Sequence, residues 1–155
     1  MHIDEKNFIS SNIQIFCCPK CGSNLDLNID SLVCSKCQQN YQVVDNIPSL
    51  FWPNEWDSSK KDVTADIKSF YEKTPFPNYD EFDNAGSLMD KARKGIFAKL
   101  LDDQIPFGAR ILECGCGTGQ LTNFLSISNR TAIGIDICMN SLKLANDFKE
   151  ANKLS

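Results

Sequence analysis

Two groups of residues in this chain have the types and the spacing that site chemistry requires. The first is a set of cysteines in the pattern C-x2-C-x12-C-x2-C, namely Cys18, Cys21, Cys34 and Cys37. The second is the glycine-rich stretch "ECGCGTG" at 113–119, which directly follows an apolar run. The first pattern predicts a metal site, and the second predicts a site for a nucleotide-type ligand.

The cysteine spacing is typical of zinc. Two residues between cysteines let one tight turn direct both thiolates at a single ion, and two such turns complete a tetrahedral site. Gly22 gives the backbone freedom that the first turn needs. We assign Cys18 rather than Cys17, because Cys17 and Cys21 would have the wrong spacing. Four thiolates leave no position open for water or substrate, so we expect structural zinc; the alternative is four reduced cysteines in a β-rich module.

The glycine stretch is compatible with two classes of cofactor. A dinucleotide dehydrogenase needs G-x-G-x-x-G, but the last glycine of that pattern would fall at Gln120. Asp136 follows Gly115 by 21 residues, close to the about 20 expected for a ribose-binding acid in a βαβ unit. A carboxylate there could accept from both ribose hydroxyls. The alternative is a plain tight turn followed by a solvated strand end.

The stretch "ECGCGTG" resembles motif I of the class I S-adenosylmethionine-dependent methyltransferases, and the resemblance covers roughly residues 62–155. It implies that the chain binds S-adenosylmethionine. By this resemblance, Glu113 serves the methionine amino end of the cofactor and Asp136 binds the ribose hydroxyls. The loop residues that it assigns to cofactor binding are Gly115, Cys116, Gly117 and Gly119.

Residues 15–51, with "CPKCG", "LVCSKC" and "YQVVDNIPSLF", resemble the zinc-ribbon modules of the tRNA-methyltransferase activator type. The two resemblances together imply an α+β zinc ribbon followed by the first part of an α/β Rossmann-like methyltransferase fold. The expected divisions are a ribbon at 1–53, a linker with pre-core helices at 54–108, and part of the cofactor-binding domain at 109–155.

The elements that would position the cysteines are short. Residues 14–51 predict β segments around turns, in "QIF", "NLDLNIDSLVC" and "NYQVVDNIPSLF". A core this small needs a staple. The polar stretch at 52–62 is interpreted as a linker.

A helix is predicted next, because Val63, Ile67, Phe70 and Tyr71 share one helical face; Pro75 ends it. The stretch "FYEKTPFPNYDEFD" at 70–83 resembles a segment that precedes motif I in a subset of these methyltransferases. It could cover the cofactor cleft, with Tyr71 or Tyr79 touching the ligand. The alternative is packing of a helix and loop against the sheet.

A second helical stretch, "LMDKARKGIFAKLLDD", follows at 88–103. Ser87 and Asp90 resemble a capping box at its start. Its predicted apolar stripe consists of Leu88, Ala92, Ile96 and Leu100. Arg93 on this helix could reach the cofactor carboxylate, or could simply be solvated. From residue 109, strand, helix, strand and helix follow in order, which predicts a parallel sheet.

Composition excludes several classes. The chain has 155 residues, 42% of them hydrophobic, and dividing it after 53 and 103 gives charges of about −2, −3 and +1, which sum to −4. No section has the basic excess of an electrostatic nucleic-acid binder. No apolar run reaches the roughly 18 residues of a membrane span, and no signal peptide opens the chain, so we expect a cytoplasmic protein without a membrane partner.

These features lead us to expect an S-adenosylmethionine-dependent methyltransferase with unknown catalytic residues. Its acceptor is a small molecule or, as the minority interpretation, RNA. The alternative is a zinc-ribbon activator module for a partner methyltransferase, non-catalytic by itself. The resemblance implies seven strands, and only two are predicted here. We therefore expect that the chain is a fragment, or that a partner chain completes the sheet, and that the 155-residue chain alone turns over little.

Overall fold

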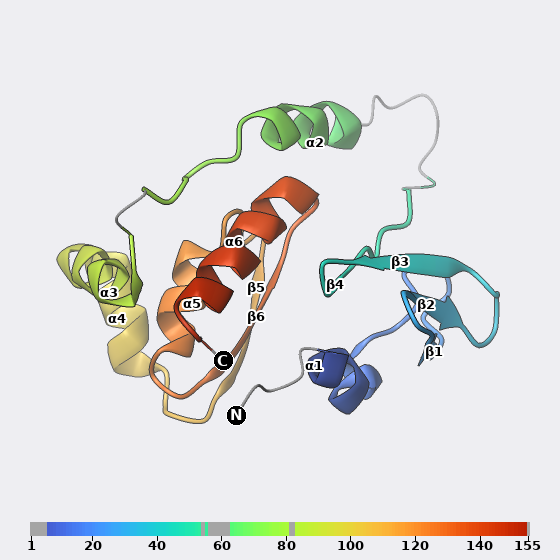
Figure 1. Cartoon of the computed structure of the whole chain (residues 1–155), viewed down its shortest axis with the longest axis horizontal. Coiled ribbons are helices and arrows are strands. Elements are labelled where there is room, and N and C mark those ends of the chain that lie inside the picture. Colours follow the sequence, from blue (N-terminus) through green and yellow to red (C-terminus); the bar gives the residue numbers. More distant parts are fainter. Residues whose placement is uncertain (1–5, 54, 56–62, 81–82, 155) are drawn as a thin grey trace. The chain divides into compact units, whose positions relative to one another are not determined.

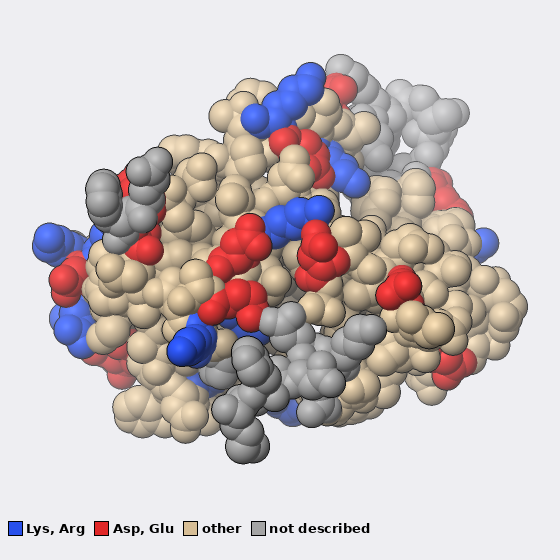
Figure 2. Space-filling model, in the orientation of Figure 1, with Lys and Arg blue, Asp and Glu red and all other residues tan. Residues whose placement is uncertain are grey.

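The computed structural model describes residues 6–53, 55, 63–80 and 83–154, and the chain divides into two compact units (Figure 1). These units are Met1–Asp62 and Val63–Ser155. Most of the predicted linker at 52–62 lies outside the described residues. Acidic and basic side chains are interspersed on the face drawn in Figure 2. Within the described ranges, every helix is too short or too polar to cross a membrane.

The first unit is built on a four-stranded antiparallel sheet in the order β1-β2-β3-β4. Its elements are α1 Lys6–Ser11, the 3-10 helix η1 Ile13–Ile15, β1 Leu25–Leu27, β2 Ser31–Cys34, β3 Asn40–Val44 and β4 Ile47–Pro48. The turn between β3 and β4 places Asp45 and Asn46 at φ 51° and 60°. Two successive left-handed residues of these types are typical of a tight β-hairpin.

The predicted strand "QIF" is wrong. Ile13–Ile15 form a 3-10 turn in which Phe16 N donates to Ile13 O at 3.1 Å. Extended pairing begins only at Cys17, which forms an isolated bridge with Asn24. Helix α1 was not expected, because six residues are too few to show a helical period.

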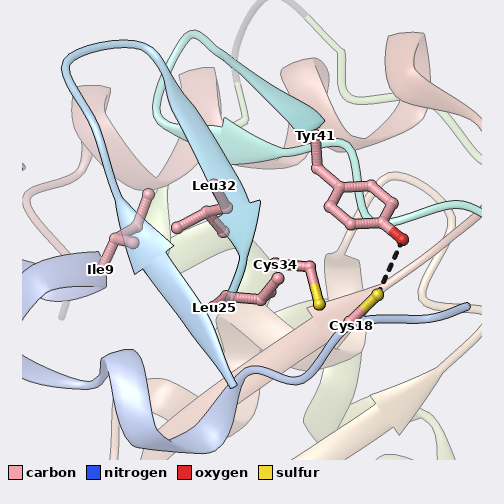
Figure 3. Close-up of a cluster of buried hydrophobic side chains, with 6 residues drawn as sticks. All are labelled: Ile9, Cys18, Leu25, Leu32, Cys34 and Tyr41. Carbon is pink, nitrogen blue, oxygen red and sulfur yellow. Dashed lines mark hydrogen bonds between the residues drawn. The ribbon is translucent and has the colours of Figure 1, made fainter. Parts of the chain in front are cut away.

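The core of the first unit is small. Its buried members, drawn in Figure 3, are Ile9, Cys18, Leu25, Leu32, Cys34 and Tyr41. Two of these six are predicted metal ligands, so part of the interior consists of polar sulfur rather than hydrocarbon. A core of this size supplies little hydrophobic stabilisation, which agrees with the expected need for a cross-link such as a bound metal ion.

The second unit has the expected βαβα order, with β5 and β6 paired in parallel. Its elements are α2 Thr64–Lys73, α3 Ala85–Lys94, α4 Ile96–Gln104, β5 Arg110–Cys114, α5 Gln120–Ser126, β6 Thr131–Ile135 and α6 Met139–Ala151. The buried core joins α3, α5 and α6 through Leu88, Phe124, Leu125 and Phe148. α2 ends before Pro75 as predicted, but its apolar stripe stays 39–62% exposed.

The capping box of α3 lies three residues earlier than predicted. The Asn84 side chain accepts from Ser87 N at 3.1 Å, and Ser87 Oγ accepts from Asn84 N at 2.9 Å. Ser87 is therefore the third helical residue rather than the cap, and Asp90 takes no part in the box.

The stretch 88–103 is two helices rather than one. Gly95, with φ −85° and ψ 120°, is extended and separates α3 from α4. The break resets the helical phase, so Ile96 and Leu100 are 78% and 55% exposed instead of continuing the stripe of Leu88. Ala98 and Leu101 of α4 pack against the core instead.

Arg130 joins the end of α4 to the start of β6. Its side chain is 2% exposed, and Nη1 lies 2.7 Å from Asp102 Oδ1. Its other donors bond backbone carbonyls of Asp102, Ile105 and Pro106, at 2.8, 2.6 and 3.3 Å. The guanidinium thus satisfies carbonyls that the helix end leaves free, and it lowers the pKa of Asp102.

Arg130→Ala should destabilise the second unit by about 2–4 kcal/mol, because it removes a buried charge together with the N–H groups that donate to three backbone carbonyls. Arg110→Ala, at an exposed position of β5, is the control and should change stability by less than about 0.5 kcal/mol. Urea unfolding followed by hydrogen exchange of β5 and β6 amides measures both. Equal stability of the two variants would contradict this role.

Stability should also depend on pH through Asp102. Its folded pKa is depressed, so its contribution is present above the unfolded value of about 3.9 and is lost as pH falls through the folded pKa. The stability difference between wild type and Asp102→Asn should therefore be large at pH 7 and shrink toward pH 3. A difference that is constant over this range would rule out the charge contribution.

Candidate metal centre and cofactor loop

The four predicted metal ligands lie together in the first unit. The sulfur atoms of Cys18, Cys21, Cys34 and Cys37 all lie within 4.8 Å of one another. The Cys18 and Cys37 sulfurs lie 3.6 Å apart, and the Cys21 and Cys34 sulfurs lie 3.5 Å apart. Sulfurs at about 2.3 Å from a tetrahedral zinc ion would be about 3.8 Å apart. The group can therefore hold a metal ion such as zinc with small side-chain adjustments.

Both cysteine turns have the same backbone geometry. Gly22 N donates to Cys18 O at 2.8 Å, and Gln38 N donates to Cys34 O at 3.1 Å. The residue that follows each pair is left-handed, with φ 70° at Gly22 and 57° at Gln38. The sequence indicated the first turn through its glycine, whereas Gln38 gives no such signal.

The surroundings of the sulfurs shift the pKa values of Cys18 and Cys37 in opposite directions. Burial disfavours the Cys18 thiolate, but the Tyr41 hydroxyl at 3.1 Å, together with backbone N–H groups, lowers its pKa to about 6. Figure 3 shows this contact. A backbone bond from Gln39 favours the Cys37 thiolate, yet burial and the neighbouring sulfurs outweigh it and raise its pKa to about 11. A cation placed among the sulfurs would favour the Cys37 thiolate and so offset this rise in its pKa.

Two further features of this group bear on the assignment. Cys17 is exposed and stands outside the group, whereas Cys18 is 1% exposed and inside it. Tyr41 was missed in the sequence, although it occupies an inward position in the alternating pattern of β3. That pattern predicts burial but not a bond to sulfur.

We expect purified protein to contain about one metal ion per chain, and Cys34→Ser combined with Cys37→Ser to lose it and unfold the first unit. Cys17→Ser combined with Cys114→Ser is the control and should keep both metal and fold. Elemental analysis and circular dichroism distinguish the pairs. A folded first unit without metal would contradict the role of the cysteines.

In the second unit, the parallel register brings the glycine loop next to Asp136. Cys114 pairs with Ile135, and Gly115 N donates to Ile135 O at 2.8 Å. Asp136 Oδ2 accepts from Gly117 N, and Oδ1 accepts from Cys138 N, each at 2.9 Å. Each carboxylate oxygen keeps a second acceptor site, so Asp136 can still accept from hydroxyl groups of a ligand.

Glu113 lies at the end of β5, half-buried, and accepts a hydrogen bond from Thr122 Oγ1 of α5. The neighbouring Cys116 is buried, and an added Cβ on Gly134 would lie 2.8 Å from its sulfur. Burial together with the charges of Asp136 and Glu113 raises the pKa of Cys116 to about 12. Its thiol is neutral at pH 7, and its backbone is already paired: Cys116 N donates to Ile135 O at 3.0 Å, and Cys116 O accepts from Gly119 N at 2.9 Å.

The glycines of the loop serve different purposes. Gly115 has φ 74° and open space where a side chain would begin. Gly119 has φ 72°, and a Cβ there would come within 2.6 Å of Ala145 Cβ in α6. Gly115 therefore leaves room beside the strand end, whereas Gly119 allows α6 to approach. Gln120 is not a glycine position but begins α5, and its side chain donates to Asn78 O at 3.1 Å.

Three residues considered as ligand contacts have other surroundings. Tyr79 stacks on Phe148 with ring centroids 4.1 Å apart, and Asn123 Nδ2 donates to its hydroxyl at 3.0 Å. Tyr79 thus belongs to the core, and burial raises its pKa to about 12. Tyr71 packs edge-to-face on Phe70. Arg93 is exposed in the last turn of α3, and its charge helps to lower the pKa of Asp102.

Neither a scan of protein-family models nor a search of curated proteins found a match to this chain. The fold and the sites therefore define the class coarsely. The chain is an α/β protein with an antiparallel sheet, a parallel strand pair and a four-cysteine group that can hold a metal ion.

Proposed function

We propose that this chain carries the donor site of an S-adenosylmethionine-dependent methyltransferase, in a Rossmann-like unit preceded by a structural zinc ribbon of the tRNA-methyltransferase activator type. The main observation behind the proposal is the hydrogen bond that Gly117 N of the glycine loop donates to Asp136 Oδ2. A glycine loop and an acid at the ends of adjacent parallel strands are the arrangement that binds nucleosides in α/β folds.

The surroundings of the loop support a cationic ligand over a dinucleotide. The carbonyl oxygens of Pro77 and Asn78 bond side chains of the loop and of the α5 N-terminus, and Phe76 O lies 3.6 Å from an ideal Cβ on Gly117. Carbonyl oxygens favour a nearby cation and disfavour a pyrophosphate. S-adenosylmethionine carries a sulfonium and an ammonium beside one carboxylate, whereas NAD carries a doubly charged pyrophosphate, so the loop suits S-adenosylmethionine better.

The proposed roles follow from these contacts. The bound donor supplies an electrophilic methyl group. Glu113, held by Thr122, would receive the ammonium end, and Asp136 would accept from the ribose hydroxyls. Methyl transfer is an in-line displacement that depends chiefly on alignment, so a rigid loop between two strands suits it. No described residue is assigned as the catalytic base.

The acceptor is proposed to be a small molecule, with RNA as the minority interpretation. The sequence offers no basic section for RNA, since residues 1–53, 54–103 and 104–155 have charges of about −2, −3 and +1. The second candidate function is an activator module for a partner methyltransferase, and the observation in its favour is that the four-cysteine unit has a core of its own.

We expect the chain to bind S-adenosylmethionine and Asp136→Ala to weaken binding tens of fold or more, because each charge-assisted bond to a ribose hydroxyl is worth about 1.5–3 kcal/mol. Asp103→Ala removes an exposed carboxylate of α4 and is the matched control, with unchanged affinity. Isothermal calorimetry measures both variants.

Because Asp136 also holds the loop, Asp136→Asn is included as a milder change, with hydrogen exchange of β5 and β6 amides reporting the fold. Unchanged affinity in a folded Asp136 variant, or tighter binding of NAD than of S-adenosylmethionine, would refute the assignment.

A further inference from the structure

A segment before the strands lies along the glycine loop. We call residues 70–80 the strap; it comprises the last turn of α2 and the proline-containing loop that follows. Its first attachment is Glu72, whose Oε1 accepts from Met139 N at 2.9 Å and whose Oε2 accepts from Asn140 N at 3.1 Å. In addition, Asn140 Nδ2 donates to the backbone carbonyl oxygen of Glu72 at 2.8 Å. The carboxylate thus satisfies free N–H groups at the start of α6, where negative charge is favoured.

The second attachment is to the loop itself. Thr118 is 0% exposed, and its hydroxyl donates to Pro77 O. The Gln120 side chain also donates to Asn78 O, and Phe76 O lies beside Gly117. Three successive carbonyls of the strap, those of residues 76–78, therefore face residues 117–120. Beyond them, Tyr79 is fixed between Phe148 and Asn123.

One attachment lies within the glycine loop, at Thr118, and the other lies just after Asp136, at Met139 and Asn140. Gly117 donates its N–H to Asp136, the residue proposed to bind the ribose. Gly117 is also the loop residue next to Phe76 O of the strap, so Asp136 and the strap both contact the same loop residue. Met139, which Glu72 caps, lies three positions after Asp136. Movement of the strap would therefore displace both sides of the loop.

We propose that the strap is a wall of the methyl-donor site and that Glu72 and Thr118 are positioning residues, which hold this wall and its carbonyls against the glycine loop. The inference rests on the proposed function. Neither residue needs to touch the donor. Glu72 fixes the strap to the helix that follows the ribose acid, and Thr118 fixes it to the loop. The carbonyl oxygens of the wall favour the cationic end of the donor.

The test uses the full chain and compares Glu72→Gln and Thr118→Val with matched controls. Glu150→Gln makes the same change in an exposed residue at the other end of α6, and Thr131→Val makes the same change at an exposed position of β6. Calorimetry measures the affinity for S-adenosylmethionine. Hydrogen exchange measures protection of strap amides with and without this ligand, while β5 and β6 amides report the fold.

We expect S-adenosylmethionine to slow exchange of strap amides in the wild type. Glu72→Gln and Thr118→Val should bind it about three- to tenfold more weakly and lose most of that protection, whereas the controls stay within about twofold. Wild-type binding without added protection of the strap overturns the inference and leaves the proposed function standing. Wild type that does not bind S-adenosylmethionine refutes the proposed function, and the inference with it.

Discussion

Four sulfur atoms within 4.8 Å of one another repel strongly once they are ionised, and this constraint governs the first unit. The core around them has few hydrocarbon side chains, so it cannot impose the arrangement by packing alone. Tyr41 and the backbone N–H groups of the two turns stabilise part of the charge. A bound cation would supply the remainder, and the antiparallel strands would then be stabilised through their ligands.

In the second unit, the negative charges that need compensation are carboxylates rather than sulfurs. Asp136, Glu72 and Asp102 are each held by donors from a distant part of the chain: the glycine loop, the start of α6, and Arg130. Each contact joins elements that local sequence does not join. Backbone N–H groups and one guanidinium compensate these negative charges, and the contacts connect α2 to the start of α6 and α4 to the residue before β6.

Local patterns explain how much could be predicted. The two cysteine turns and the order from β5 to α6 depend on residues a few positions apart, and both were predicted. The phase shift at Gly95 was not, because a glycine within a helical stripe does not by itself indicate a break. Glu72 gave no signal either, since its partners lie 67 and 68 residues away. Tyr41 was predictable as buried, but its bond to sulfur depends on strand pairing.

The preference of the proposed donor site for one ligand class over another depends on the groups of the chain that lie at the starts of α5 and α6. A helix N-terminus ordinarily attracts phosphate, and α6 begins directly after the ribose acid. The chain places its own carboxylate there, through Glu72, and it places strap carbonyls beside the start of α5. A ligand with a pyrophosphate would have to displace these groups. For the proposed donor, which combines a nucleoside with a net positively charged chain, these groups would be favourable neighbours, so the proposal prefers S-adenosylmethionine to a dinucleotide.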